Sequence, residues 1–243
     1  MSCARKNQSS FATVSTDEVF ATGGFKIVYR GVYKNGPRKG QDCVCKVFKT
    51  GAVYEKSFFD HEMNVVNRAM LLIEKFNAAN LINKKIYLNQ PAIWEFTQDS
   101  GYAGQKNLIE PMIEDFEKFN SNSGWVADDD TPWNLVMQAL SHFSYHVSGG
   151  FFLLCDLQGG IYRDGVVLTD PVIMSRRKEY GPTDLGPEGI STFFARHECN
   201  QYCRSEWTSP RNRDVYFDYR KGTSMIHVPT RPSRAAMSKQ SYY

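Results

Sequence analysis

The chain has little that would place it in a membrane or among secreted proteins. Its longest apolar runs, Phe151–Cys155 and Ala69–Ile73, are far shorter than the ~20 residues of a membrane-spanning helix. The N-terminus reads MSCARKNQSS and lacks the apolar stretch of a secretory signal. We therefore expect a cytoplasmic protein that does not enter a membrane.

A large excess of charge of either sign is also absent. The 243 residues carry a formal net charge of +3, from 29 Lys and Arg against 26 Asp and Glu. This balance gives no reason to expect a nucleic acid or an anionic membrane as partner. The composition is not that of a disordered chain either, because 42% of the residues are hydrophobic and can form a large packed core.

Cysteine is sparse and offers no disulfide framework. The six cysteines are Cys3, Cys43, Cys45, Cys155, Cys199 and Cys203. Because the chain shows no export signal, disulfides are not expected, and metal ligation is the better interpretation of clustered cysteines.

Periodic apolar residues predict the first structural elements. Alternating residues at 25–29 and 43–48, separated by a Gly/Pro/Asn-rich turn at 35–40, predict a β-hairpin. Apolar residues at steps of three and four predict a helix over 57–77. A second helix is expected to begin after Thr131-Pro132, since Thr before Pro is a typical helix start.

The second half of the chain changes in character. An apolar strand over 151–156 is expected to form a hairpin with a strand that ends at Asp170, whereas 171–215 shows few periodic elements. This order of elements indicates an α+β fold in two lobes. The expected divisions are a flexible N-terminus at 1–15, a globular domain at 16–215 with lobes of about 16–112 and 113–215, and a flexible tail at 216–243.

Lys46 lies inside a predicted strand, with Val44 and Phe48 on the same face. A lysine in such a strand often lies at an edge and extends its ammonium group to water. Alternatively, a rigid strand can hold the ammonium group where it binds nucleotide phosphates, as kinases require. The strand pattern leaves both interpretations open.

Two aspartates and a glutamine form a second candidate site. Asp156 ends an apolar strand, Gln158 follows two residues later on the same face, and Asp170 ends the strand expected to pair with it. Oxygen ligands gathered at one end of a hairpin suit one or two Mg²⁺ ions. Asp-Leu-Gln-Gly and Asp-Pro are also ordinary turn sequences, so turn capping is the alternative.

A His/Cys cluster is the strongest local signal. His197-x-Cys199-x3-Cys203 places three preferred zinc ligands within seven residues. His142 and His146, one turn apart on the second predicted helix, are both candidates for the fourth ligand. Buried thiols without a metal are the alternative.

Taken together, these motifs resemble the alpha-kinase family, which includes myosin-heavy-chain kinases, elongation-factor-2 kinase and channel-linked kinases. The resemblance covers about residues 18–207. The motifs, in order, are Val44-Cys-Lys46-Val-Phe, Asn107-Leu-Ile-Glu110-Pro111, Lys118-Phe-Asn120-Ser-Asn122-Ser-Gly124, Leu140-Ser-His142-Phe-Ser-Tyr, Leu153-Leu-Cys-Asp156-Leu-Gln158-Gly159, Leu168-Thr-Asp170-Pro171 and His197-x-Cys199-x3-Cys203.

The resemblance implies an ATP-dependent serine/threonine protein kinase with a protein-kinase-like fold. Its N-lobe is expected to be mainly an antiparallel sheet with one helix, and its C-lobe to be mixed around a structural zinc ion. In the nucleotide site, Lys46 and Lys26 would contact the ATP phosphates, and the backbone of Glu110 and Met112 would contact adenine. The resemblance does not assign the partner of Lys46, for which Glu62 on the first predicted helix is a candidate.

The resemblance also implies roles for the remaining candidates. Asp156 would orient or deprotonate the substrate hydroxyl, and Gln158 and Asp170 would bind Mg²⁺. The implied zinc ligands are His142, His197, Cys199 and Cys203. The segment from Gly181 to Gly186, a plain loop by its composition, corresponds to a glycine loop associated with peptide substrates.

Two other function classes remain to be distinguished. One is a catalytically weak kinase-like module that binds nucleotide or a protein partner; the presence of Lys46, Asp156, Gln158 and Asp170 favours an enzyme instead. The other is a zinc hydrolase, which four protein ligands disfavour because they leave no open position for water. The sequence does not predict the protein substrate, a regulator or the oligomeric state.

Overall fold

The computed structural model describes residues 2–129, 131–218 and 221. The helices are α1 (Asp60–Ala78), preceded by the 3-10 turn η1 (Lys56–Phe59), α2 (Pro132–Val147) and α3 (Gly186–Arg196). In the described part of the chain, no helix has both the length and the apolarity needed to cross a membrane. Most of the tail predicted at 216–243 lies outside the described residues.

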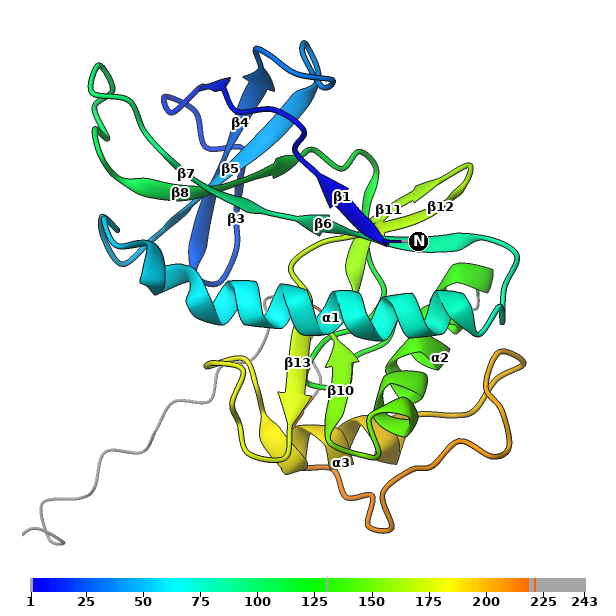
Figure 1. Ribbon diagram of the computed structural model, residues 1–243. Helices are drawn as coiled ribbons and strands as arrows, with labels where there is room; N and C mark the ends of the chain where they lie inside the picture. The colour runs from blue at the N-terminus through cyan, green and yellow to red at the C-terminus, as the bar shows by residue number, and fades with distance from the viewer. Residues whose placement is uncertain (1, 130, 219–220, 222–243) are drawn as a thin grey trace, which may run out of the picture.

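An antiparallel sheet lies at the upper left of the molecule in Figure 1. The predicted hairpin is confirmed, since β4 and β5 pair with Val28 opposite Lys46. The sheet has the order β2-β4-β5-β8-β7, with β3 on β4; its strands are β2 (Ala12–Val14), β3 (Ala21–Thr22), β4 (Lys26–Tyr33), β5 (Asp42–Phe48), β7 (Ala92–Glu95) and β8 (Lys106–Pro111).

A second sheet joins segments that are far apart in the sequence. Its strands, in spatial order, are β1 (Ala4–Lys6), β6 (Lys85–Gln90), β12 (Gly165–Leu168), β11 (Gln158–Tyr162) and β9 (Phe116–Lys118). The first fifteen residues, expected to be flexible, therefore supply β1 to this sheet and β2 to the first one. Their period-2 pattern is too short to be visible in the sequence.

The prediction that the strand at 151–156 pairs with the strand ending at Asp170 is wrong. The strand β10 (Phe152–Cys155) pairs with β13 (Val172–Ser175), whereas β11 pairs with β12. Both aspartates therefore lie where the chain passes between the two ladders: Asp156 from β10 to β11 and Asp170 from β12 to β13. The two aspartates still lie in one region, because the Gln158 amide contacts both residues.

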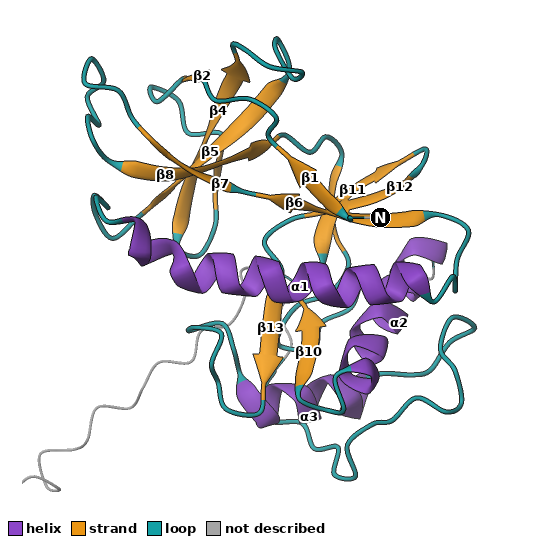
Figure 2. Ribbon diagram, viewed as in Figure 1, coloured by secondary structure: helices purple, strands orange, loops and turns teal. Residues whose placement is uncertain are grey.

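The helix α1 lies between the two sheets and the lower β10–β13 ladder (Figure 2). Its buried face includes Val66, Ile73 and Phe76, and Phe76 packs edge-to-face on Phe143 of α2 with ring centroids 5.3 Å apart. Each fully buried side chain of this kind contributes about 2 kcal/mol to stability. The predicted helix at 57–77 is thus confirmed, and its apolar stripe joins the two halves of the molecule.

The C-terminal helix α3 was not predicted. Its sequence, GPEGISTFFAR, contains two glycines and a proline and has low intrinsic helix propensity. Ile190, Phe193 and Phe194 are buried against β10 and β13, so tertiary packing stabilises this helix.

Candidate active site

Lys46 is a buried cation with two carboxylate partners. It projects from β5, only 6% of the residue is exposed, and its ammonium group forms ion pairs with Glu110 on β8 and with Asp170 at 2.5 Å. Burial disfavours the charged ammonium, but the two carboxylates outweigh that effect and raise the pKa of Lys46. Lys46 is therefore charged at any physiological pH and does not reach water from a sheet edge.

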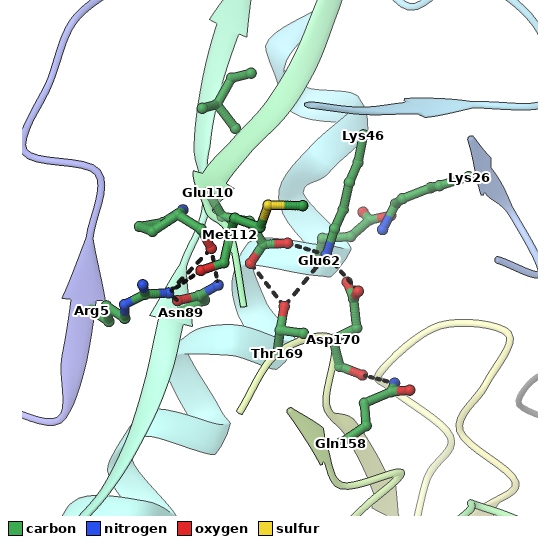
Figure 3. A network of polar contacts seen from close by, with 12 residues as sticks. Arg5, Lys26, Lys46, Glu62, Asn89, Glu110, Met112, Gln158, Thr169 and Asp170 are labelled. Carbon is green, nitrogen blue, oxygen red and sulfur yellow. Dashed lines mark hydrogen bonds and ion pairs between the residues drawn. The ribbon is translucent and has the colours of Figure 1, made fainter. Parts of the chain in front are cut away.

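The expected pairing of Lys46 with Glu62 is wrong. Glu62 on α1 pairs instead with Lys26, at 3.4 Å, while Glu110 pairs with Lys46 (Figure 3). The Thr169 hydroxyl donates to the second oxygen of Glu110 at 2.8 Å, so both carboxylate oxygens of this buried residue have partners. Glu110 and Lys46 are one strand apart in the same sheet, whereas Glu62 would have had to approach from the helix.

Asp170 faces both Lys46 and solvent. Its side chain is 46% exposed, which leaves room for a ligand on the side away from Lys46. Partial removal from water disfavours the charged carboxylate, but Lys46 and Lys26 lower the pKa of Asp170 below its ordinary value. The carboxylate is therefore ionised at neutral pH, as a metal ligand must be.

Asp156 lies beside Asp170 and is linked to it through Gln158. The Gln158 amide donates to an Asp156 oxygen at 3.2 Å and to the Asp170 backbone carbonyl at 3.4 Å. Lys118, at the end of β9, forms an ion pair with the other Asp156 oxygen at 2.9 Å. The structure thus brings together the three residues that the sequence grouped and adds Lys118, a third lysine, which was not predicted for this site.

The backbone at both aspartates is strained in the same way. Asp156 has φ of 56° and Asp170 has φ of 46°, in the left-handed region that Asp tolerates better than most residues. Gly159 permits the nearby strands to approach, because a Cβ there would lie 1.9 Å from the carbonyl oxygen of Val167. Strain of this kind is found where surrounding structure fixes a functional geometry.

The segment after β8 links the two halves of the chain near Lys46. The carbonyl oxygen of Met112 accepts a hydrogen bond from Arg5 at 3.0 Å, and its N–H donates to the carbonyl of Asp42 at 3.2 Å. Both polar backbone groups of Met112, expected to face a nucleotide base, therefore have protein partners. Glu110 faces the same region with its side chain, and Figure 3 draws it between Arg5 and Lys46.

Four side chains form a compact group at the other end of the molecule. His142 on α2 meets His197, Cys199 and Cys203, and their candidate ligand atoms all lie within 4.8 Å of one another. His142 Nδ1 lies 3.2 Å from His197 Nε2 and 3.6 Å from Cys199 Sγ, while Cys203 Sγ lies 3.7 Å from His197 Nε2. His146 is outside the group and accepts a hydrogen bond from the backbone of Thr208.

These distances fit a tetrahedral metal ion. Bonds of about 2.0–2.1 Å to nitrogen and about 2.3 Å to sulfur would separate neighbouring ligand atoms by about 3.3–3.8 Å. The other ring nitrogen of His142 lies 3.2 Å from the carbonyl of Thr208, which leaves Nδ1 free of a proton for a metal. Burial lowers the pKa of His197 to about 4 and raises the pKa of Cys203 to about 11, so that without a metal both side chains are neutral at pH 7.

The glycine loop is held by a buried carboxylate that sequence reasoning missed. Gly181 and Gly186 have positive φ, and Gly186 is the first residue of α3, so the loop leads directly into this helix. Asp184, 1% exposed, accepts hydrogen bonds from the backbone of Ser175, Tyr180 and Gly186 and from the Ser175 hydroxyl. The only hint in the sequence was an Asp between two glycines, which is also typical of a turn.

Sequence comparison connects this site with known proteins. Residues 21–203 match the model of the Alpha-kinase family. The chain is 31% identical over 202 residues to "Alpha-protein kinase 1" of Dictyostelium discoideum, covering 81% of this chain and 14% of the relative. It is 40% identical over 114 residues to "Eukaryotic elongation factor 2 kinase" of Homo sapiens, covering 44% of this chain and 15% of the relative. The chain thus spans only a small part of these relatives' length.

Structural comparison agrees. The fold is similar to that of a solved alpha kinase from Entamoeba histolytica, with a TM-score of 0.68, 23% identity, and coverage of 89% of this chain and 85% of the other. It is also similar to the inactive alpha-kinase domain of myosin heavy chain kinase A in complex with ATP, with a TM-score of 0.65, 25% identity, and coverage of 79% and 87%. The chain belongs to the alpha-kinase family.

Proposed function

We propose that this chain is an ATP-dependent protein kinase that transfers the γ-phosphate of ATP to a serine or threonine hydroxyl of a protein. The observation that carries the proposal is the network in which the buried Lys46 meets Glu110, Thr169 and Asp170, with Asp156 and Gln158 adjoining it. A strand-borne cation beside ionised carboxylates is what phosphoryl transfer needs, because catalysis there consists mainly of positioning and charge neutralisation.

Lys46 and Lys26 are the proposed phosphate-binding cations. Glu110 holds the Lys46 ammonium in place through an ion pair, and Glu62 does the same for Lys26. Gln158 and Asp170 are the proposed ligands of Mg²⁺, which prefers oxygen donors. When bound, the ion would neutralise phosphate charge. The contact between the Glu110 backbone and adenine, implied by family resemblance, remains part of the proposal.

Asp156 is the proposed residue that receives the substrate hydroxyl. Its carboxylate has a fixed orientation, because Lys118 holds one oxygen and Gln158 the other. From there it can accept a hydrogen bond from an incoming hydroxyl and take its proton as the new P–O bond forms. The loop from Gly181 to Gly186, anchored by Asp184, is the proposed contact for the peptide around that hydroxyl.

The His/Cys group is proposed to bind a structural zinc ion. Its four ligands would close the coordination sphere, so the metal would not react. It would join α2 to the irregular segment after α3, where His197, Cys199 and Cys203 lie. The proposed catalytic domain therefore includes the segment that carries the zinc ligands, and it comprises both lobes of the expected 16–215 domain.

Transfer of labelled phosphate from ATP to a generic basic protein tests the function. We expect transfer by the unmodified chain and a loss of at least about 100-fold with Asp170→Ala, which removes a proposed Mg²⁺ ligand. Nucleotide binding without any transfer would favour the alternative, a kinase-like binding module. Transfer that continues unchanged in the variant would contradict the role given to Asp170.

A further inference from the structure

Arg5, in the first strand of the chain, contacts the segment that follows β8. Its terminal nitrogen Nη1 lies 3.2 Å from the carbonyl oxygen of Pro111, 3.0 Å from that of Met112 and 3.0 Å from Oδ1 of Asn89 (Figure 3). The Asn89 amide also donates to the Pro111 carbonyl at 2.8 Å. A guanidinium group and an amide thus converge on two successive backbone carbonyls.

The N-terminal segment is built into the fold around Arg5. Strand β1 pairs in parallel with β6, and Arg5 is opposite Asn89 in the register. On one side Cys3 is buried in the main core, and on the other the Asn7 amide donates to the carbonyl of Ile109 at 2.9 Å. Arg5 is therefore held in place by its neighbours before and after it in the chain.

The contacts of Arg5 determine how the peptide groups of Met112 and Ile113, the linker after β8, are oriented. The described peptide bonds are all trans, so each C=O and the following N–H point in opposite directions. The Pro111 carbonyl faces Arg5, and the Met112 N–H accordingly faces the other way, toward the carbonyl of Asp42. The Met112 carbonyl also faces Arg5, which directs the N–H of Ile113 away from Arg5.

Two successive carbonyls on one side are not the arrangement of an extended strand, in which they alternate. Their negative ends repel each other, and a cation between them offsets that repulsion through charge-assisted hydrogen bonds. The N–H of Ile113 has no hydrogen-bond acceptor within the part of the chain that the structure describes. This N–H points away from Arg5, and Figure 3 draws Lys46 on the opposite side of Glu110 and Met112 from Arg5.

We propose that Arg5 is a positioning residue for nucleotide recognition: it fixes the Met112–Ile113 peptide so that the Ile113 N–H donates to an acceptor nitrogen on the edge of the adenine ring. This inference rests on the proposed function, since it presumes that ATP binds beside Lys46. Arg5 lies outside the residues that match the family model, 21–203, and before the expected domain start at 16. The functional unit therefore includes the N-terminal strand.

The test is a binding measurement with two ligands, ATP and inorganic tripolyphosphate, which carries the phosphates but no base. With Arg5→Ala, the Kd for ATP should rise about tenfold, the factor that corresponds to one hydrogen bond of ordinary net strength. The Kd for tripolyphosphate should stay within about twofold of its normal value. In transfer assays the same variant should raise the KM for ATP and leave kcat nearly unchanged.

Arg38→Ala is the matched control. Arg38 donates to the backbone carbonyl of Lys6 at 2.8 Å, so it also holds strand β1, but its other side-chain bond goes to Gln41 and not to the linker. This variant should bind both ligands as the unmodified chain does. Arg5→Lys retains a charge without the planar fork and should give an intermediate Kd for ATP.

The outcomes separate this inference from the proposed function. The inference is overturned if Arg5→Ala and Arg5→Lys both weaken the binding of ATP and tripolyphosphate equally, or both leave the two affinities unchanged. Arg5 would then have only a structural role or none. If the unmodified chain binds neither ligand, or if Lys46→Ala does not weaken the binding of tripolyphosphate, the proposed function is contradicted instead. If Arg5→Ala does not fold, Arg5→Lys alone decides: a selective loss of ATP affinity supports the inference and an equal loss of both overturns it.

Discussion

Replacing Glu110 by leucine should strongly destabilise the fold, because it leaves a buried lysine charge with one partner in place of two. Glu110 is 2% exposed and Lys46 6% exposed, so neither group can turn to water when the other is removed. Asp170 remains near Lys46 but lies half in solvent, and its attraction is correspondingly weaker. The Thr169 hydroxyl also loses the oxygen to which it donates.

The structure sets the expected size of the effect. Breaking a buried ion pair by removing one partner costs about 3–5 kcal/mol, and the remaining Asp170 puts this case at the lower end, near 3 kcal/mol. The hydroxyl without an acceptor adds about 1 kcal/mol. With a slope of about 3 kcal/mol per molar, the midpoint of urea unfolding should fall by a little more than about 1 M.

A double substitution tests the reasoning behind that number. Lys46→Met with Glu110→Leu removes both charges, and the double variant should recover to within about 2 kcal/mol of the unmodified chain. As a control, Glu95→Leu removes the partner of Lys106 in the same sheet, where the Glu95 side chain is 51% exposed, and should cost less than about 1 kcal/mol. A double variant no more stable than Glu110→Leu alone would refute the argument, since the stranded charge could not then be the cause.

Three further predictions concern the metal, the loop and the effect of pH. Cys199→Ser should abolish binding of one zinc equivalent and lower Tm by at least about 5 °C, while His146→Ala, outside the group, should retain the metal; equal metal content in both would contradict the site. Asp184→Ala should lower the free energy of unfolding by about 3 kcal/mol and raise the KM for peptide more than the KM for ATP. It should also make the loop easier to cleave in limited proteolysis, and unchanged cleavage would count against the anchoring role of Asp184. Because the pKa of Asp170 is lowered in the fold, the ionised carboxylate stabilises the folded chain at neutral pH. This stabilisation is lost as pH falls below about 4, the ordinary pKa of an aspartate. In urea titrations, the unmodified chain should therefore lose its stability advantage over Asp170→Asn at acidic pH. An advantage that grows on acidification would refute this.

Much of the site could be predicted from the sequence because its residues lie at the ends of strongly patterned segments. Lys46 is flanked by alternating apolar residues, and Asp156 follows an apolar strand, so the apolar pattern alone assigns both positions to elements. The zinc-type group was visible because three of its members lie within seven residues.

The parts that were missed depend on contacts between distant segments. The pairing of β10 with β13 instead of β12 leaves the apolar pattern of each strand unchanged, so periodicity could not distinguish the two topologies. The partner of Lys46 is Glu110, 64 positions away, whereas Glu62 was the candidate from the sequence. Arg5 lies in a three-residue strand, which is too short to produce a recognisable pattern.

The proposed phosphoryl transfer from ATP requires that Asp156 receives the substrate hydroxyl. The most direct test is a single-turnover measurement of labelled phosphate transfer by Asp156→Asn, with ATP binding measured on the same sample. We expect ATP binding to remain within a few-fold of normal while transfer slows by about 100-fold or more. Transfer at the normal rate by a variant that still binds ATP would contradict it.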